Sequence, residues 1–136
     1  MDLFEISAKK IFTEPRGTLG VIEFQNLPFI PHRLYWIINV PDKVSRGSHA
    51  HKELKQCFFS ICGNFTLIIR DGVQSQTIEI QAGDPMTYVG PGLWRELTDF
   101  SQDAIACVIV DNEYQETDYI RNWSEYLKWV GSKDSQ

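Results

Sequence analysis

The chain has 136 residues and a formal net charge of -5, and this length predicts a single domain over residues 1–136. An acidic chain argues against a nucleic-acid partner, although a local arginine cluster could still hold one anionic ligand. The first residues are acidic where a secretory leader would be basic, and no apolar run approaches the ~20 residues of a membrane helix. We therefore expect a cytoplasmic protein without a membrane partner.

The three cysteines, Cys57, Cys62 and Cys107, are odd in number and lie in apolar runs. This pattern predicts small buried hydrophobes in a reduced compartment and argues against a disulfide framework.

Short apolar runs broken by Gly, Pro or Asn dominate from Ile6 to Val110, which is typical of an all-β sandwich or barrel of roughly nine or ten strands. We expect a first strand over 3–12, a turn over 14–17 and a returning strand over 18–24. A strand over 33–40 then places alternate residues on two faces, which we expect to meet a core and a pocket. The core face would carry Leu34, Trp36, Ile38 and Val40, and the pocket face Arg33, Tyr35, Ile37 and Asn39.

In the middle of the chain, 58–62 and 65–69 are predicted to form a hairpin around Gly63-Asn64. A second hairpin is predicted at Asp71-Gly72, because both residues accept positive φ at little cost. Further strands are expected over 77–80, 86–89, 95–100 and 104–110, with a corner at 90–92. The last element is a short helix over 123–130, capped by Asn122 and apolar at helical spacing.

His49 and His51 are two residues apart, so an extended segment would point both imidazoles into the same space. Two histidines on one strand could equally be polar residues of an outer face. The spacing around them, with Gln56 five residues after His51 and Gly63 seven further on, resembles the first signature of the cupin superfamily. The second cupin signature has its counterpart in Gly83-Asp84 followed by residues 89–95.

The cupin resemblance implies four metal-ligand positions, of which this chain keeps two histidines. Gln56 stands where the family has Glu, and Trp94 falls where the family has a third His. Since an indole offers only an N–H donor, we expect a pocket without a metal or another cofactor.

Four motifs, R-G-x-H-A-H-K, V-G-P-G-L-W-R-E-L, P-R-G and D-Y-I-R-N, together resemble one family, the nucleotide-sugar 3,4-ketoisomerases that act on dTDP-4-keto-6-deoxyglucose. The resemblance extends from about residue 6 to residue 129. It implies a metal-free cupin jelly roll (double-stranded β-helix) with a short C-terminal helix, and a homodimer that exchanges N-terminal strands. It also implies a step in making 3-acetamido-3,6-dideoxyhexoses for surface polysaccharides such as lipopolysaccharide or S-layer glycans.

Moving a ketone from C4 to C3 requires a base and a proton donor with pKa values near neutrality, which histidine provides. The family implies His49 as base and His51 as its partner, and the division of these roles stays open. Tyr35 is expected to donate to the developing enediolate oxygen.

For the anionic diphosphate, guanidinium groups are the natural partners. Arg46 and Arg95 are the first candidates and Arg16 with Gly17 and Lys52 the second, while Gln56 and Trp94 complete the expected substrate site. The Arg16-Gly17 pair could instead be only a turn, and Trp94 only core packing. We expect Arg33 and Arg70 to be solvated.

Two other functions stay open on the sequence: a module that binds a nucleotide sugar without turning it over, and a metal-dependent cupin oxygenase or epimerase. The configuration of the C4 hydroxyl in the product is also open.

Overall fold

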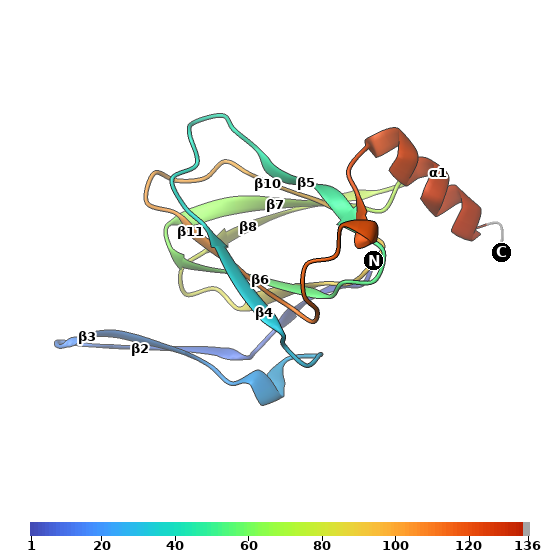
Figure 1. The fold of residues 1–136 in the computed structure, drawn as a ribbon. Helices are drawn as coiled ribbons and strands as arrows, with labels where there is room; N and C mark the ends of the chain where they lie inside the picture. The colour runs from blue at the N-terminus through green and yellow to red at the C-terminus, as the bar shows by residue number, and fades with distance from the viewer. Residues whose placement is uncertain (135–136) are drawn as a thin grey trace.

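The computed structural model describes residues 1–134, which form two five-stranded antiparallel sheets, a separate two-stranded hairpin and one helix (Figure 1). The first sheet has the order β1 (Leu3–Ile6), β9 (Met86–Val89), β6 (Gln56–Cys62), β11 (Ile105–Val110) and β4 (Arg33–Ile37). The second has the order β12 (Tyr119–Ile120), β5 (Arg46–His51), β10 (Trp94–Thr98), β7 (Asn64–Arg70) and β8 (Ser75–Gln81). The hairpin pairs β2 (Lys9–Glu14) with β3 (Gly17–Ile22), α1 spans Trp123–Asp134, and short 3-10 turns cover Phe24–Asn26 and Glu116–Asp118. The predicted all-β class with one short C-terminal helix is confirmed.

The main core lies between the two sheets, because each sheet turns alternate apolar side chains inward. Phe58 and Val108 enter it from the first sheet, and Leu67, Ile69 and Leu97 from the second, all fully buried. Burying each such side chain contributes about 1.5–3 kcal/mol, so this layer fixes the spacing of the sheets.

Helix α1 covers the outer face of the second sheet, where Trp94, Ile120 and Tyr126 form a separate buried cluster with Ala50. The helix begins as predicted, since the Asn122 Oδ1 accepts the backbone N–H of Glu125 at 3.0 Å. The Tyr126 hydroxyl donates to the carbonyls of Gly92 at 2.8 Å and Arg70 at 3.2 Å, which joins the helix to two strand ends.

The β2–β3 hairpin projects from the body of the molecule, and Figure 1 shows it extended away from both sheets. Its side chains Ile11, Phe12 and Leu19 are exposed. The predicted turn at 14–17 is confirmed between the two strands, whereas the strand expected over 3–12 is broken. The break lies at Ala8, whose side chain is buried against the first sheet and whose carbonyl accepts the backbone N–H of Glu23.

The hairpin predicted around Gly63-Asn64 is wrong, because β6 pairs with β9 and β11 while β7 pairs with β8 and β10. Gly63 has φ +65°, and a Cβ there would lie 2.9 Å from the Cα of Ala104, so the chain turns a corner that only glycine allows. The chain thereby crosses from the first sheet to the second. The hairpin predicted at Asp71-Gly72 is confirmed between β7 and β8.

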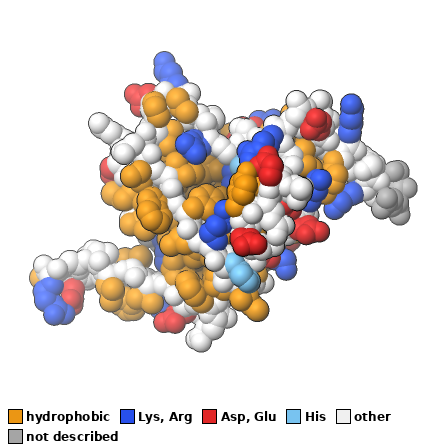
Figure 2. Space-filling view, viewed as in Figure 1, with side chains coloured by type: hydrophobic (Ala, Val, Ile, Leu, Met, Phe, Trp, Pro, Cys, Tyr) orange, Lys and Arg blue, Asp and Glu red, His pale blue; other side chains and the backbone are white. Residues whose placement is uncertain are grey.

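Strand β4 begins as predicted but ends at Ile37, three residues before the expected end at Val40, and its two faces are not used as expected. Tyr35 and Ile37 turn inward and pack against the main core, whereas Leu34, Trp36 and Ile38 are 51%, 61% and 47% exposed. The apolar face of this edge strand therefore remains uncovered in the single chain. Figure 2 shows hydrophobic side chains over much of the body on the side of the projecting hairpin.

Cys57 and Cys107 are buried as expected, and Cys62 is only partly buried. All three thiols are free. Among residues 1–134 there is no helix long and apolar enough to cross a membrane.

Candidate active site

A pocket of about 390 Å³ opens where β4, the edge of the first sheet, faces β5 and β12 at the edge of the second. Its lining comes from β4, β5, β10 and the segment around β12, so residues far apart in the sequence meet there. The lining residues are Arg33, Tyr35, Trp36, Ile37, Arg46, Gly47, Ser48, His49, Arg95, Tyr119 and Arg121.

The two histidines lie side by side on the inner face of β5, as their spacing predicts. His49 is 8% and His51 3% exposed, and their Nε2 atoms are 3.1 Å apart. The Nδ1 of His51 lies 2.9 Å from Oδ2 of Asp118. The aromatic ring of Tyr119 contacts both imidazoles, with centroids 4.8 Å and 4.4 Å away. Both rings are thus held in place by neighbours on β12 and the turn before it.

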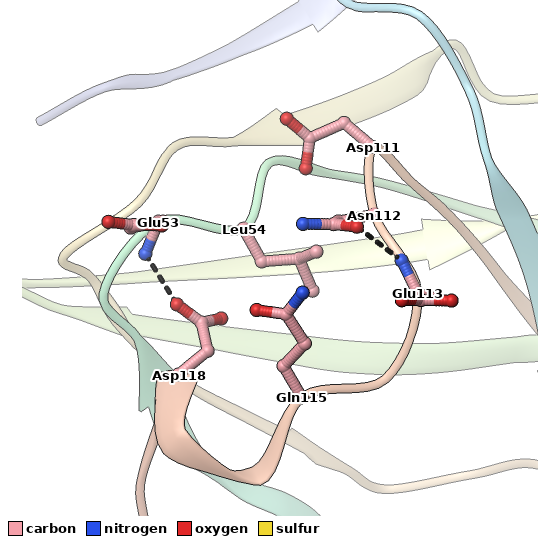
Figure 3. Close-up of a pocket in the computed structure, with 7 residues that line it drawn as sticks. All are labelled: Glu53, Leu54, Asp111, Asn112, Glu113, Gln115 and Asp118. Atoms are coloured by element: carbon pink, nitrogen blue, oxygen red, sulfur yellow. Dashed lines mark hydrogen bonds between the residues drawn. The ribbon is translucent and has the colours of Figure 1, made fainter.

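Asp118 reaches the histidines because β12 pairs with β5, which sets Tyr119 opposite His51. Its other oxygen, Oδ1, accepts the backbone N–H of Glu53 at 2.7 Å (Figure 3). Its carbonyl accepts the backbone N–H of Lys52 at 2.9 Å. The Asp118 side chain is therefore fixed at both oxygens.

Arg95 lies directly opposite His49 in the pairing of β10 with β5, and its buried guanidinium organises the floor of the pocket. Its Nη2 donates to the Tyr35 hydroxyl at 2.8 Å, its Nε to Oε1 of Gln56 at 3.2 Å and its Nη1 to the carbonyl of Gly47 at 2.8 Å. Gly47 has φ +69°, and a Cβ there would lie 2.0 Å from Nη1 of Arg95. Glycine is needed for this close approach.

The pocket is positively charged although the chain is acidic. Arg33, Arg46, Arg95 and Arg121 line it, and no lining residue among those the structure describes is acidic. The Cζ atom of Arg121 lies 4.2 Å from the centre of the Tyr119 ring. The carboxylate of Glu116 accepts hydrogen bonds from Nε and Nη2 of the same guanidinium. Such a set of guanidinium groups is suited to an anionic ligand such as a diphosphate.

Burial, followed by the charges of Arg95, His51 and Arg121, lowers the pKa of His49 from 6.5 to about 2. Burial and then Arg95 lower the pKa of His51 to about 4, although the hydrogen bond and charge of Asp118 act in the opposite direction. Both imidazoles are therefore neutral near pH 7 in the empty pocket. A general base has to be unprotonated before it can remove a proton, so the pair is in the required state.

A second hollow, of about 230 Å³, lies next to the histidine pocket and is shown in Figure 3. Four carboxylates line it, from Glu53, Asp111, Glu113 and Asp118, so its charge opposes that of the first pocket. The residues described do not include a group of three His, Cys, Asp or Glu placed to hold a metal ion. Because the histidines and arginines gather in the other pocket, we place the chemistry there.

The structure brings only some of the predicted residues together. His49, Tyr35, Arg46 and Arg95 line the pocket, and His51 and Gln56 lie directly behind them. Arg16 and Gly17 lie at the tip of the projecting hairpin, and Lys52 borders a different hollow. Trp94 is buried on the outer face under α1, because it pairs with Ala50 and so faces away from His49.

Three residues in or behind the pocket were given no role from the sequence, and a fourth was expected to be solvated. Asp118, Tyr119 and Arg121 belong to the D-Y-I-R-N motif, which was noticed but given no role. Arg33 was expected in solvent but is partly buried, with its guanidinium 5.6 Å from the Tyr35 ring. The motif itself was the available signal, since it places an acidic, an aromatic and a basic side chain within four residues.

The two packed antiparallel sheets define the fold class, a cupin-type jelly roll that sugar epimerases also have. A 4-keto-6-deoxy sugar epimerase from Streptomyces spheroides is 15% identical and superposes with a TM-score of 0.73, covering 87% of this chain and 67% of the epimerase. That likeness shows the fold alone, and it confirms the predicted cupin jelly roll.

The family is shown by closer matches. Residues 2–131 match the family described as FdtA: WxcM-like, C-terminal. The TDP-4-oxo-6-deoxy-alpha-D-glucose-3,4-oxoisomerase of Aneurinibacillus thermoaerophilus is 35% identical over 125 residues, covering 92% of this chain and 90% of the relative. QdtA, a sugar 3,4-ketoisomerase from Thermoanaerobacterium thermosaccharolyticum solved with TDP, is 30% identical with a TM-score of 0.90 and covers 97% and 96% of the two chains. A histidine-to-asparagine variant of QdtA was solved with TDP-4-keto-6-deoxyglucose. The chain belongs to the sugar 3,4-ketoisomerase family and is an isomerase.

Proposed function

We propose that the protein converts dTDP-4-keto-6-deoxy-D-glucose to a dTDP-3-keto-6-deoxyhexose. The observation that carries this proposal is the buried His49–His51 pair at the wall of a pocket lined by four arginines. One part of the pocket can move a proton, and the other can hold a diphosphate. The names of the relatives support the same substrate, since one acts on the TDP-4-oxo sugar and another was solved with TDP.

His49 removes the C3 proton of the bound sugar in the proposed reaction, and the electron pair of that C–H bond forms an enediolate. The same pair of histidines then supplies a proton to C4, while the C3 hydroxyl loses its hydrogen and the C4 oxygen gains one, which leaves the ketone at C3 and a hydroxyl at C4. Proton transfer by positioned side chains contributes about 10²–10⁴-fold to a rate. The neutral state of His49 in the empty pocket supports its role as the base.

Tyr35 stabilises the charge that develops on the sugar oxygen. Arg95 donates to its hydroxyl oxygen at 2.8 Å, and the Gln56 amide lies 3.4 Å from the same oxygen. Because both groups direct hydrogens at that oxygen, the Tyr35 O–H is left to point elsewhere, and the ring lines the pocket. A preorganised donor of this kind stabilises an oxyanion without further rearrangement.

The diphosphate binds the guanidinium groups of Arg46, Arg33 and Arg121 in this proposal, while Arg95 is held by the pocket floor. The proposed reaction needs no metal, because imidazole nitrogens move the proton and Tyr35 and Arg95 meet the charge. Arg16, Gly17 and Lys52 do not line this pocket within one chain.

The protein works as a homodimer that exchanges N-terminal strands, by our proposal. The β2–β3 hairpin exposes Ile11, Phe12 and Leu19, and the edge strand β4 exposes Leu34 and Trp36. An edge strand with an apolar face and unpaired backbone groups is suited to cover by a second copy. Such an exchange would carry the hairpin tip of one copy onto the other.

We place the reaction in the cytoplasm, in the synthesis of 3-acetamido-3,6-dideoxyhexoses for surface polysaccharides.

The proposal is tested by following the sugar ring protons by NMR after the purified protein is added to dTDP-4-keto-6-deoxy-D-glucose. We expect conversion to a 3-keto product, and His49→Asn should lower kcat about 10²–10⁴-fold while dTDP still binds. The matched variant His32→Asn, which changes an exposed histidine, should leave the rate unchanged. Normal turnover by a folded His49→Asn protein would remove His49 from the chemistry, and no product from the normal protein would remove the function.

A further inference from the structure

We propose that Asp118 is a positioning residue of this reaction, which fixes the tautomer of His51 and, through His51, makes Nδ1 of His49 the nitrogen that removes the substrate proton. The inference rests on the proposed function and adds to it a third side chain and a named atom.

Three side chains form a continuous line of hydrogen bonds. Oδ2 of Asp118 lies 2.9 Å from Nδ1 of His51, and Nε2 of His51 lies 3.1 Å from Nε2 of His49. The His49–His51 contact is buried, and the Asp118 side chain is only 12% exposed. Nδ1 of His49 has no hydrogen-bond partner among residues 1–134, and His49 lines the pocket.

The positions of the hydrogens follow from the order of donors and acceptors. A carboxylate only accepts, so Nδ1 of His51 carries the hydrogen that it donates to Asp118. In a neutral imidazole the other nitrogen is then bare, so Nε2 of His51 accepts from Nε2 of His49. His49 is left with a bare Nδ1, which is the nitrogen available to the substrate.

This order requires that His51 is neutral, and the surroundings favour that state. Burial and then the nearby charge of Arg95 lower the pKa of His51 to about 4. Arg33 acts in the same direction, and Asp118 acts in the opposite direction. A second hydrogen on His51 would oppose the one on His49, because two N–H groups would then face each other.

Asp118 cannot turn away easily, because the polypeptide holds it from two sides. Its Oδ1 accepts the backbone N–H of Glu53 at 2.7 Å, which Figure 3 shows at the edge of the acidic hollow. Its own carbonyl accepts the backbone N–H of Lys52 at 2.9 Å. The carboxylate is therefore aimed at His51 by strand pairing as well as by its own contacts.

The proton balance of the step can be written with these groups. The C3–H bond breaks, its electron pair enters the enediolate, and the proton forms a new N–H bond at Nδ1 of His49. The imidazolium can pass its Nε2 hydrogen to Nε2 of His51, so that the positive charge lies beside the Asp118 carboxylate. The reverse movement restores the hydrogen to His49, and the proton on Nδ1 is then delivered to C4. The hydrogen of the C3 hydroxyl passes to the C4 oxygen, so that the C3 oxygen becomes the ketone and the C4 oxygen a hydroxyl.

Asp118→Asn tests this arrangement with little change of shape. The amide oxygen can still accept from Glu53, while the amide N–H₂ donates to Nδ1 of His51 and so forces the hydrogen of His51 onto Nε2. His49 must then carry its hydrogen on Nδ1, which blocks the base. We expect kcat to fall about 10²–10⁴-fold with an unchanged KM for the dTDP sugar.

Asp111→Asn is the matched control. Asp111 lines the same acidic hollow, and its Oδ1 accepts the backbone N–H of Lys55 at 3.0 Å. Its substitution removes the same charge from the same hollow but changes no contact with a histidine, so kcat should stay normal. An equal loss in both variants would show a general effect of charge and would overturn the role of Asp118.

Long-range ¹H–¹⁵N NMR of the histidine rings reads the tautomers directly and needs no substrate. In the normal protein we expect the Nδ1–H form of His51 and the Nε2–H form of His49, and in Asp118→Asn the reverse of both. An Nε2–H form of His51 in the normal protein would overturn the proposal, even if the Asp118→Asn variant failed to fold.

Failure of this inference can be told from failure of the proposed function. If the normal protein isomerises the dTDP sugar and folded Asp118→Asn does so at full rate, Asp118 has no part in the reaction and the function stands. If the normal protein leaves the sugar unchanged while its rings show the expected tautomers, the proposed function fails, and only the order of hydrogen bonds from Asp118 to His49 stands.

Discussion

The two buried histidines that form the site also make the folded protein sensitive to acid. Their pKa values are lowered from 6.5 to about 2 for His49 and about 4 for His51, mainly by burial. Between pH 6.5 and about 4 the unfolded chain therefore binds two protons that the folded protein does not. Because proton binding is linked to folding, the stabilisation that comes from this difference in bound protons is complete above pH 6.5 and is lost as the pH falls below that value.

We expect the free energy of unfolding to fall by up to about 1.4 kcal/mol per pH unit for each histidine below pH 6.5. Urea unfolding at a series of pH values between 7 and 5 measures this slope, and this window lies above the ordinary pKa of the carboxyl groups. His49→Asn should reduce this slope by the contribution of one proton, up to about 1.4 kcal/mol per pH unit. An identical slope in the two proteins would show that His49 is not held neutral by the fold.

At the scale of single residues, the sequence correctly predicted the features that depend only on local spacing. His49 and His51 face the same way because a strand has a period of two residues, and that is independent of the rest of the fold. Asp118 lies 67 residues from His51 along the chain. Its contact depends on the pairing of β12 with β5, and a two-residue strand gives too little pattern to predict that pairing.

Helix α1 shows how one element supports the strand that carries the site without touching the pocket. The Tyr126 hydroxyl donates to the carbonyls of Gly92 and Arg70, at the corner before β10 and at the end of β7. Trp94, the first residue of β10, packs beneath the same ring. The helix therefore fixes the start of the strand that also carries Arg95.

Tyr126→Phe should lower the free energy of unfolding by about 1–3 kcal/mol, because the partly buried carbonyls of Gly92 and Arg70 lose their shared donor while the ring stays in place. The KM for the dTDP sugar should stay close to normal, since the pocket lies on the other face of the sheet. Chemical denaturation measures the first effect and the NMR assay the second. Unaltered stability in Tyr126→Phe would mean that the helix does not hold this corner.

Strands and turns were predicted well where the local sequence pattern fits only one arrangement, and poorly where the same pattern fits two. The second cupin signature was used to align the residues after the 90–92 corner, and this alignment placed Trp94 in the pocket. In the structure, the pairing of β10 with β5 turns Arg95 toward the pocket and Trp94 away from it. On β4 the more apolar face was assigned to the core. That face is exposed in the single chain. Alternating apolar residues occur both in the core of one chain and on a surface that a second copy covers, so the pattern alone does not distinguish the two.

At the scale of the whole molecule, the projecting hairpin and the uncovered face of β4 bound a hollow of about 830 Å³. Ile11 and Leu34 line it, together with Phe24 and Ile61, and all four side chains are exposed. A contiguous group of exposed apolar side chains of this kind is typical of a protein–protein contact.

Leu34→Glu should therefore weaken the proposed dimer, because a charge placed in a dry interface loses its hydration without gaining a partner. Light scattering at micromolar concentration should give a dimer mass for the normal protein and a monomer mass for the variant. Val73→Glu, at a side chain 92% exposed in the β7–β8 turn, is the control and should remain a dimer. A monomeric normal protein would contradict strand exchange.

The corner at Gly63 has a consequence for how quickly the sandwich can form. Because the chain changes sheets there, β7–β8 is the one pair of consecutive strands that join directly within the two sheets of the described chain. Every other pairing in these sheets joins strands that are separated along the chain, such as β5 with β10 and β4 with β11. Loop closure has to precede those pairings, and chains dominated by distant contacts fold in milliseconds to seconds. The β7–β8 hairpin is then the natural starting point, and the pocket, which is lined from β4, β5, β10 and the segment around β12, assembles only when refolding is nearly complete.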